Sequence, residues 1–416
     1  MEHVYDIVII GGGAAGMTAA ISALETDPRQ RVIIIEKKRE LGRKILATGN
    51  GRCNLSNVRC ARHRETLDFF SRLGILTRTD GDGRIYPYTE DAADVRDALA
   101  EKAAALGAEF FCGLETEAAA APESGGEFLI RCGKAPEKGA RGKNGKIKKN
   151  VERRPAGTET FRARRLILAC GGKAGPKLGT TGSGAVLARS LGHTVTRLAP
   201  ALTAVEVRDA DETLAGVRAG AEVALKYRGR ELFRERGEIQ FTQYGVSGIC
   251  VFDLSRYMVI PEGKTLKNGF DDYRIEIDFL PDVSDAEALL EERRAAGAGP
   301  DALLRSIVKR PLAERILART GGRIPETAAE LKHFTLCPKG LKGWDFAQVT
   351  KGGVSLAEID MDTMESFVIP GLFFAGEIID YDGPCGGYNL QNAWETGLRA
   401  GRAAGGGRTE TGAEHK

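Results

Sequence analysis

Short apolar runs separated by a segment of small residues open the chain. Residues 5–10 (YDIVII) and 31–36 (RVIIIE) each contain four consecutive apolar residues, which is typical of strands buried on both faces of a parallel sheet. Residues 14–25 between them are rich in alanine and predict a helix. A strand, a helix and a second strand in this order predict a right-handed crossover, so the chain begins as an α/β domain.

The pattern indicates that this domain continues to residue 193. Helical spacing at 89–106 is followed by strand-like runs at 108–117 and 127–132. Residues 164–172 (RRLILACGG) form another apolar run that ends in glycines, as expected of a further buried strand.

Beyond residue 193 apolar and polar residues alternate, in segments such as TAVEV and YRIEIDFL. This alternation predicts half-buried antiparallel strands. Ser284 and Glu287 then have capping-box spacing and open a helical stretch rich in Ala, Leu, Glu and Arg. Residues 371–377 (GLFFAGE) predict a last buried strand, and a helix is expected from about 390 to 404.

These patterns predict an α/β fold with inserted segments. The predicted domains are the two parts of the α/β domain (1–193 and 351–416), the β-rich middle domain (194–279 and 334–350) and a helical insertion (280–333).

Composition excludes several classes of protein. The 416 residues are 42% hydrophobic, with a net charge of only +3, so no general field favours nucleic acid or an anionic membrane. No apolar run is long enough to span a membrane and no charged leader with a cleavage site is evident, so we expect a cytoplasmic protein. The eight cysteines form no C-x-x-C pair or zinc-type cluster, which predicts free thiols and no metal site.

One segment departs from this even charge distribution. Residues 134–154 hold nine basic residues against two acidic ones. Their low apolar content favours a solvated hairpin tip, and contact with nucleic acid is the alternative, although no aromatic residues interleave to stack on bases.

A nucleotide-binding motif joins the first strand to the first helix. Gly11, Gly13 and Gly16 satisfy G-x-G-x-x-G, and Glu36 follows 20 residues later at the end of the second strand, where it can accept hydrogen bonds from a ribose. Glu36 disfavours a 2′-phosphate, so the adenosine belongs to FAD or NAD. The cations at 37–39 leave phosphate neutralisation open.

Residues 41–57 (LGRKILATGNGRCNLSN) are unusually rich in glycine and asparagine, and they begin with two cations. Their backbone and side-chain amides can reach a pyrophosphate, a ribityl chain or a flavin ring.

With this block, five further segments complete a resemblance to a known family. They are VIIGGGAAGMTAA at the start, CGGKAGPKLGTTGSG at 170–184, GEIQFTQYGVSG at 237–248, and the pair TKGGVSLAEIDMDTMES and PGLFFAGEIIDYDGPCGGYNLQNAWETG within 350–397. The chain resembles bacterial FAD-dependent flavoproteins described as NAD(P)/FAD-dependent oxidoreductases, aminoacetone oxidase-like proteins and 3-dehydro-bile-acid reductases. The resemblance implies a two-part, Rossmann-like FAD domain of the glutathione-reductase type, with an inserted β-barrel-like domain that carries a small helical insertion.

The resemblance also implies where non-covalent FAD is held. Contacts to the pyrophosphate and ribose are expected from Gly11, Gly13, Ala14, Ala15, Gly16, Glu36 and Lys37. Contacts to the phosphates and ring are expected from Arg43, Lys44, Thr48, Gly49, Asn50, Gly51, Arg52, Cys53 and Asn54. Contacts to the ribityl chain and pyrimidine edge are expected from Gly376, Glu377, Gly387, Tyr388, Asn389, Leu390 and Gln391.

The last group has a physical rationale of its own. A helix that begins near Leu390 points its positive end at the flavin edge where charge accumulates on reduction, which raises the reduction potential.

For catalysis the residues considered are Tyr388, Asp380 and Cys53, with Tyr381, Tyr244 and Asp382 as further proton donors or ring-orienting groups.

Three functions remain open from the sequence. The first is an oxidoreductase in which NAD(P)H, bound transiently, reduces FAD and hydride passes to an activated C=C bond of a small organic, steroid-like molecule. The second is a flavin amine oxidase that uses oxygen. The third is an RNA-associated flavoprotein that docks through residues 134–154. The expected partner is a small-molecule substrate, and the oligomeric state is left open.

Overall fold

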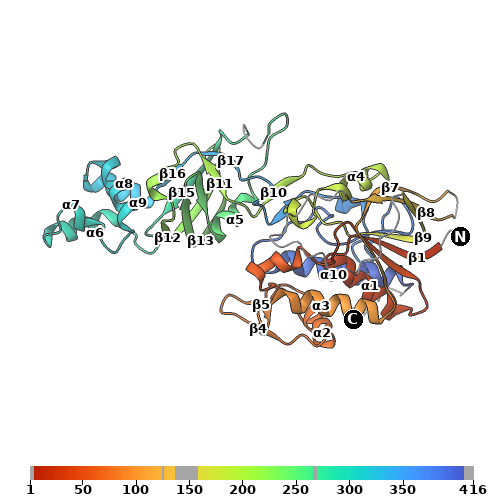
Figure 1. The fold of residues 1–416 in the computed structure, drawn as a ribbon. Coiled ribbons are helices and arrows are strands. Elements are labelled where there is room, and N and C mark those ends of the chain that lie inside the picture. Colours follow the sequence, from red (N-terminus) through yellow and green to blue (C-terminus); the bar gives the residue numbers. More distant parts are fainter. Residues whose placement is uncertain (1–3, 124–125, 136–157, 266–268, 407–416) are drawn as a thin grey trace, which may run out of the picture. The chain divides into compact units, whose positions relative to one another are not determined.

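The computed structural model describes residues 4–123, 126–135, 158–265 and 269–406. It divides into two compact units, Met1–Leu198 with Gly352–Lys416, and Ala199–Lys351 (Figure 1). Nearly all of the basic segment at 134–154 lies outside the described residues, so its hairpin and its contact with nucleic acid stay predictions.

The first unit is built on a seven-stranded sheet in the order β6-β2-β1-β9-β8-β7, with β19 also paired to β9. The parallel strands are β1 (Val4–Ile10), β2 (Val32–Glu36), β6 (Glu109–Cys112), β9 (Glu159–Leu168) and β19 (Leu372–Phe374). An antiparallel pair, β7 (Leu114–Ala120) and β8 (Phe128–Lys134), extends this sheet. Because β19 comes from the far end of the sequence, the sheet is completed only when the chain returns from the second unit.

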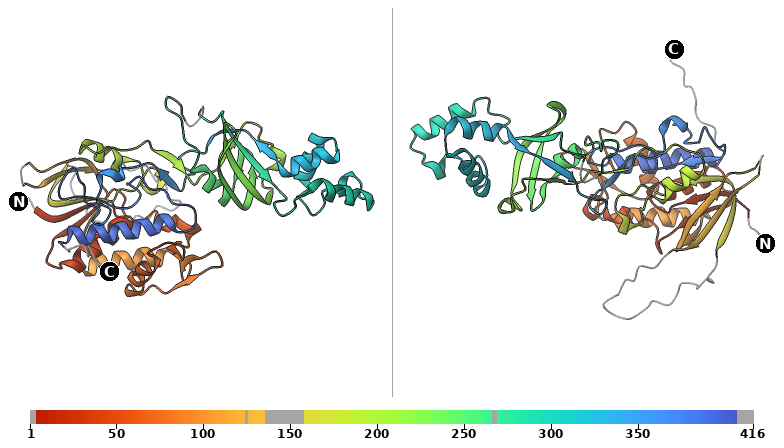
Figure 2. Two further views of the ribbon diagram at one scale, coloured as in Figure 1. Left: turned by 180° about the vertical axis from the view of Figure 1, so that it is seen from behind. Right: turned by 90° about the horizontal axis from the view of Figure 1, so that it is seen from above.

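Two helices lie against each other over this sheet, α1 (Ala14–Thr26) and α10 (Tyr388–Ala404) (Figures 1 and 2). Glycines on α10 allow the close approach: a Cβ at Gly397 would lie 2.6 Å from Ala15 O, and one at Gly401 would lie 2.2 Å from Ala19 O. The first unit also contains α2 (His63–Arg72), α3 (Ala92–Ala105), α4 (Ser183–Ser190), and a small sheet of β3 (Ser56–Asn57), β4 (Thr77–Thr79) and β5 (Arg84–Pro87).

The second unit is a seven-stranded antiparallel sheet packed against helices, in the order β16-β15-β12-β13-β14-β11-β17. Its strands are β11 (Val205–Val207), β12 (Arg218–Tyr227), β13 (Arg230–Thr242), β14 (Gly245–Ser247), β15 (Tyr273–Asp278), β16 (Phe334–Leu336) and β17 (Pro338–Leu341). Its helices are α5 (Ile249–Ser255), α6 (Ala286–Ala295), α7 (Pro300–Leu303), α8 (Arg310–Thr320) and α9 (Ile324–Lys332).

The helices of the second unit share one apolar core with its sheet, as Leu290, Leu312 and Ile316 belong to the same buried cluster as Val223 and Ile275. A short pair, β10 (Ala199–Ala201) and β18 (Val349–Lys351), lies where the chain enters and leaves this unit. The predicted α/β class, with a Rossmann-like sheet and an inserted β-rich part, is confirmed.

Candidate active site

In the turn between β1 and α1, close packing leaves no room for a side chain at two of the three motif glycines. A Cβ at Gly11, whose φ is +109°, would lie 2.3 Å from Ala169 O, and one at Gly16 would lie 1.9 Å from Gly11 O. A Cβ at Gly13, in contrast, would have no other atom within 4 Å. Gly13 is also the N-cap of α1 and offers no side chain to the first-turn amides, so these donors are left for a ligand or solvent.

Glu36 is tied to the same turn. Its Oε2 accepts a hydrogen bond from Gly12 N at 2.9 Å, and its Oε1 accepts one from Lys38 N at 2.7 Å. Lys37 turns toward another loop, where Nζ donates to Thr181 Oγ1 at 2.7 Å and lies 3.7 Å from Glu115. Lys37 is thus already engaged by protein groups beside the site predicted for the ribose.

The segment after β2 has an unusual backbone. Gly49 and Asn50 both have a φ of +57°, and Cys53 has a φ of +56°. Non-glycine residues rarely adopt this conformation, which costs free energy and concentrates at ligand-binding sites. Neighbouring residues of the protein hold the side chain of Arg52 in place. Its Nε donates to Gly49 O at 3.1 Å, and its guanidinium lies over the Tyr86 ring, 4.8 Å from the ring centroid.

The start of α10 is fastened to this segment across more than 300 residues of sequence. Gly387 approaches Ser56 so closely that a Cβ would lie 2.4 Å from Ser56 O. Asn57 Nδ2 donates to Gly386 O at 3.1 Å. The Asn54 amide, oriented to satisfy its neighbours, accepts from Gly387 N at 3.1 Å and donates to Ser56 O at 2.9 Å. The 54–57 segment and the start of α10 are therefore held together by direct contacts.

The N-terminus of α10 is left without a side-chain cap. Its N-cap is Gly387, with a φ of +102°. Asn389, in the first turn, points back instead: its Oδ1 accepts from Gly383 N at 2.8 Å and its Nδ2 donates to Gly383 O at 2.9 Å. The first-turn amides are thus available to an electron-rich group.

The end of β19 completes the site. Gly376, with a φ of +77°, packs on α1, because a Cβ there would lie 2.8 Å from Ala15 Cβ. The next residue, Glu377, has Oε2 2.5 Å from Lys44 Nζ. Two residues that the sequence predicts as separate cofactor contacts are therefore an ion pair.

The predicted cofactor residues form three groups in the first unit: the β1–α1 turn with Glu36, the 43–54 segment, and the β19–α10 segment. Arg43 and Asn50 are exposed, and Cys53 and Asn54 are buried. The sequence interpretation missed Ser56 and Asn57, whose polar side chains end the same glycine- and asparagine-rich block and were a usable signal. Three features fit an extended dinucleotide: a glycine that faces open space, helix N-termini without side-chain caps, and left-handed backbone. These residues are therefore suited to hold FAD.

The catalytic candidates differ in their surroundings. Cys53 is fully buried, and burial raises the pKa of its thiol to about 12, so it supplies no thiolate near neutral pH. Tyr388 and Tyr381 converge on Gly383: a Cβ there would lie 2.8 Å from Tyr388 Cβ and 3.0 Å from Tyr381 Oη. Tyr244 belongs to the second unit, where Lys342 Nζ lies 3.8 Å from the centroid of its ring.

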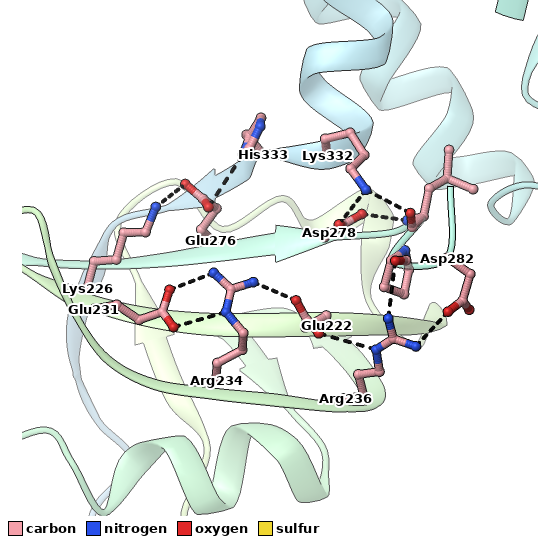
Figure 3. A network of polar contacts seen from close by, with 12 residues as sticks. Glu222, Lys226, Glu231, Arg234, Arg236, Glu276, Asp278, Asp282, Lys332 and His333 are labelled. Atoms are coloured by element: carbon pink, nitrogen blue, oxygen red, sulfur yellow. Dashed lines mark hydrogen bonds and ion pairs between the residues drawn. The ribbon is translucent and has the colours of Figure 1, made fainter. Parts of the chain in front are cut away.

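One face of the sheet in the second unit carries a network of ion pairs (Figure 3). Glu222 lies between two arginines, 2.5 Å from Arg234 and 3.2 Å from Arg236, and these hydrogen bonds hold the pKa of its carboxyl below the usual value. Lys226 and Lys332 pair with Glu276 and Asp278 in the same way. Opposite charges are matched across this face, so it presents no excess of cations to a phosphate backbone.

Within the described residues, no helix is long and apolar enough to cross a membrane. In the same residues, no three His, Cys, Asp or Glu side chains are grouped so that they could hold a metal ion.

Comparison with known proteins identifies the class. The family model described as the HI0933-like protein Rossmann domain matches residues 5–64 and 60–403. A 3-dehydro-bile acid delta(4,6)-reductase of Clostridium scindens is 37% identical over 96% of this chain and 98% of its own. A ribosomal RNA dihydrouridine synthase of Escherichia coli K12 is 29% identical over 94% of this chain and 96% of its own.

Among solved structures, a 3-ketosteroid-delta4-(5alpha)-dehydrogenase from Rhodococcus jostii RHA1 aligns over 97% of each chain, with 15% identity and a TM-score of 0.48. The fold and the site define an FAD-dependent oxidoreductase. The chain belongs to the HI0933-like Rossmann-domain family, and the family resemblance seen in the sequence is confirmed.

Proposed function

We propose that this enzyme reduces a carbon–carbon double bond conjugated to a carbonyl in a small, steroid-like molecule, with NAD(P)H as the source of electrons. The observation that carries the proposal is the identity of 37%, over nearly the full length of both chains, to a reductase that acts on a bile acid. The name of that relative describes double bonds conjugated to a 3-keto group. The uracil bond reduced in making dihydrouridine is likewise conjugated to a ring carbonyl, so both named reactions fit one chemistry.

The residues of the first unit have distinct parts in this proposal. The backbone amides in the first turn of α1, which follow the N-cap Gly13 and have no side-chain cap, bind the pyrophosphate. Glu36 binds the adenosine ribose. Bound FAD supplies hydride transfer. The start of α10, fixed to the 54–57 segment, presents its amides to the ring edge that becomes electron-rich.

Reduction of the double bond also requires a proton. Tyr388, at the first position of α10, is the proposed donor, and Asp380 is the proposed orienting group, since both lie within the β19–α10 segment. Cys53 is the weakest of the three candidates because its thiol is buried and its pKa is raised. A Tyr388→Phe variant is expected to retain FAD and slow reduction of the substrate by 10²-fold or more, on the order expected for loss of a general acid.

A second substrate has support from the comparisons. The similarity to a ribosomal RNA dihydrouridine synthase, 29% over 94% of this chain, favours uridine in RNA as an alternative with the same bond chemistry. The neutral ion-pair network of the second unit offers no additional cationic surface for it (Figure 3). Salt-dependent RNA binding that disappears when the basic segment at 134–154 is deleted would favour this alternative.

Anaerobic stopped-flow spectroscopy tests the electron donor. We expect NADH or NADPH to bleach the visible absorbance of the flavin in the purified holoenzyme, and candidate amines to leave it unchanged. Bleaching by an amine but not by either nicotinamide would overturn the proposal in favour of an amine oxidase.

A further inference from the structure

A chain of hydrogen-bonded side chains, buried at Ser56 and Gln391 and partly exposed at Glu395 and Arg399, runs from the 54–57 segment along α10. Ser56 Oγ donates to Gln391 Oε1 at 2.5 Å, and Gln391 Nε2 donates to Glu395 Oε1 at 2.6 Å. Arg399, one turn further on, lies 3.5 Å from the other oxygen of Glu395 and donates to Met361 O at 2.8 Å. Residues 391, 395 and 399 are spaced by four, so they form one stripe on the helix.

Both ends of the Gln391 amide are fixed by this chain. Ser56 is fully buried and Gln391 is 3% exposed, so neither exchanges its partner for water. The amide oxygen faces the Ser56 hydroxyl and the amide nitrogen faces the Glu395 carboxylate, which allows a single orientation. Loss of either partner leaves a buried polar atom of Gln391 without a hydrogen bond, and such atoms are costly.

The fixed amide lies in the first turn of α10. Trp394, on the same helix, also donates from Nε1 to Leu55 O at 2.9 Å, so the first two turns are attached to residues 55 and 56 by two side chains. Neither contact involves the helix N-terminal amides themselves. The chain therefore controls where those amides lie without using them as donors.

We propose that Ser56 and Glu395 are positioning residues that, through Gln391, set the reduction potential of bound FAD. This inference rests on the proposed function only in that the first turn of α10 faces the flavin ring. A fixed positive helix end stabilises the charge gained on reduction, so loosening that end lowers the potential.

The test compares two serine-to-alanine variants of the holoenzyme. Ser56→Ala removes the hydroxyl that fixes Gln391. Ser22→Ala is the matched control, because Ser22 is also buried and its Oγ donates to α10 at Leu398 O, 2.8 Å away and nearly two turns beyond Gln391. Potentials are measured against a reference dye during slow anaerobic reduction by dithionite, which needs no substrate, and melting temperatures of both variants are recorded.

We expect Ser56→Ala to shift the ratio of oxidised to reduced flavin about tenfold toward the oxidised form at the wild-type midpoint, or about 30 mV for two electrons. Ser22→Ala is expected to lower the melting temperature and leave this ratio within about twofold of wild type. Glu395→Ala should resemble Ser56→Ala, and Glu395→Gln, which keeps an acceptor for Gln391, should keep the potential close to the wild-type value.

Two results would overturn the inference. One is a lower melting temperature for Ser56→Ala with an unchanged potential, which is what a merely structural role gives. The other is an equal shift of potential in Ser22→Ala. Because dithionite is the reductant, the outcome does not depend on whether NAD(P)H or an amine is the natural donor.

Discussion

Lys44 and Glu377 form an ion pair, with Nζ and Oε2 2.5 Å apart, which joins the segment after β2 to the end of β19. Their side chains are only 26% and 18% exposed, so loss of Glu377 leaves the partly buried ammonium of Lys44 without this counter-charge. We expect Glu377→Gln to lower the free energy of unfolding of the apoprotein by about 1–2 kcal/mol and to weaken FAD binding.

A double-mutant cycle measures this pair directly. Urea unfolding of Lys44→Met, Glu377→Gln and the double variant should show that the double variant loses less stability than the sum of the single variants. Additivity of the two single effects would show that the pair contributes no coupling.

The turn glycines predict two different outcomes for the same substitution. Gly16→Ala places a Cβ 1.9 Å from Gly11 O, so we expect loss of the folded turn and a large fall in apoprotein stability. Gly13→Ala meets no protein atom within 4 Å and has an ordinary φ of −85°, so the apoprotein should unfold as wild type does. Its methyl group instead occupies the space proposed for the pyrophosphate.

FAD titration followed by flavin fluorescence distinguishes the two variants. We expect Gly13→Ala to raise the dissociation constant for FAD about tenfold or more, with an unchanged unfolding midpoint. Wild-type affinity in Gly13→Ala would place the pyrophosphate elsewhere.

The fold could be predicted where the signal is local. YDIVII and GLFFAGE each hold a run of consecutive apolar residues because both faces of their strands are covered, and the glycine at 16 is required by its contact with Gly11 in the same turn. The pairing of Lys44 with Glu377 and of Asn57 with Gly386 could not be read in this way, since each joins segments more than 300 residues apart. The sequence predicts the residues of the site, and only the tertiary structure shows which of them contact one another.

The sequence also does not reveal the environment of Glu235. It lies on the face of β13 that packs against α5, and its buried Oε2 accepts no hydrogen bond from any described residue. Burial raises the pKa of the Glu235 carboxyl from the ordinary 4.5 to about 7. The charge of Asp253 adds a smaller increase, and the charge of Arg256 opposes it. The nearby thiol of Cys250 stays neutral, because burial raises its pKa to about 11.

This shift predicts how stability depends on pH. At pH values between the unfolded and the folded pKa of Glu235, the folded protein binds one more proton at this carboxyl than the unfolded chain does. The stability that the protonated Glu235 contributes is therefore fully present below about pH 4.5 and is lost as the pH rises through 7. Glu235→Gln should remove this loss, which we expect to be on the order of 2 kcal/mol between pH 5 and 8.

Glu231→Gln is the matched control, since Glu231 lies on the same strand and its pKa is lowered by a hydrogen bond from Arg234. It should keep the wild-type dependence over this range. Urea unfolding followed by tryptophan fluorescence, with Trp344 reporting on the second unit, measures both variants. An equal slope in wild type and Glu235→Gln would contradict the assignment.

Reoxidation of the reduced enzyme tests the central claim most directly. The holoenzyme is reduced anaerobically with one equivalent of NADPH or NADH and then mixed with a 3-keto steroid that carries a conjugated double bond. We expect the flavin absorbance to return without oxygen, with one equivalent of product heavier by two hydrogens, as shown by mass spectrometry. A flavin that stays reduced with the steroid and is reoxidised only when oxygen is admitted would contradict the account.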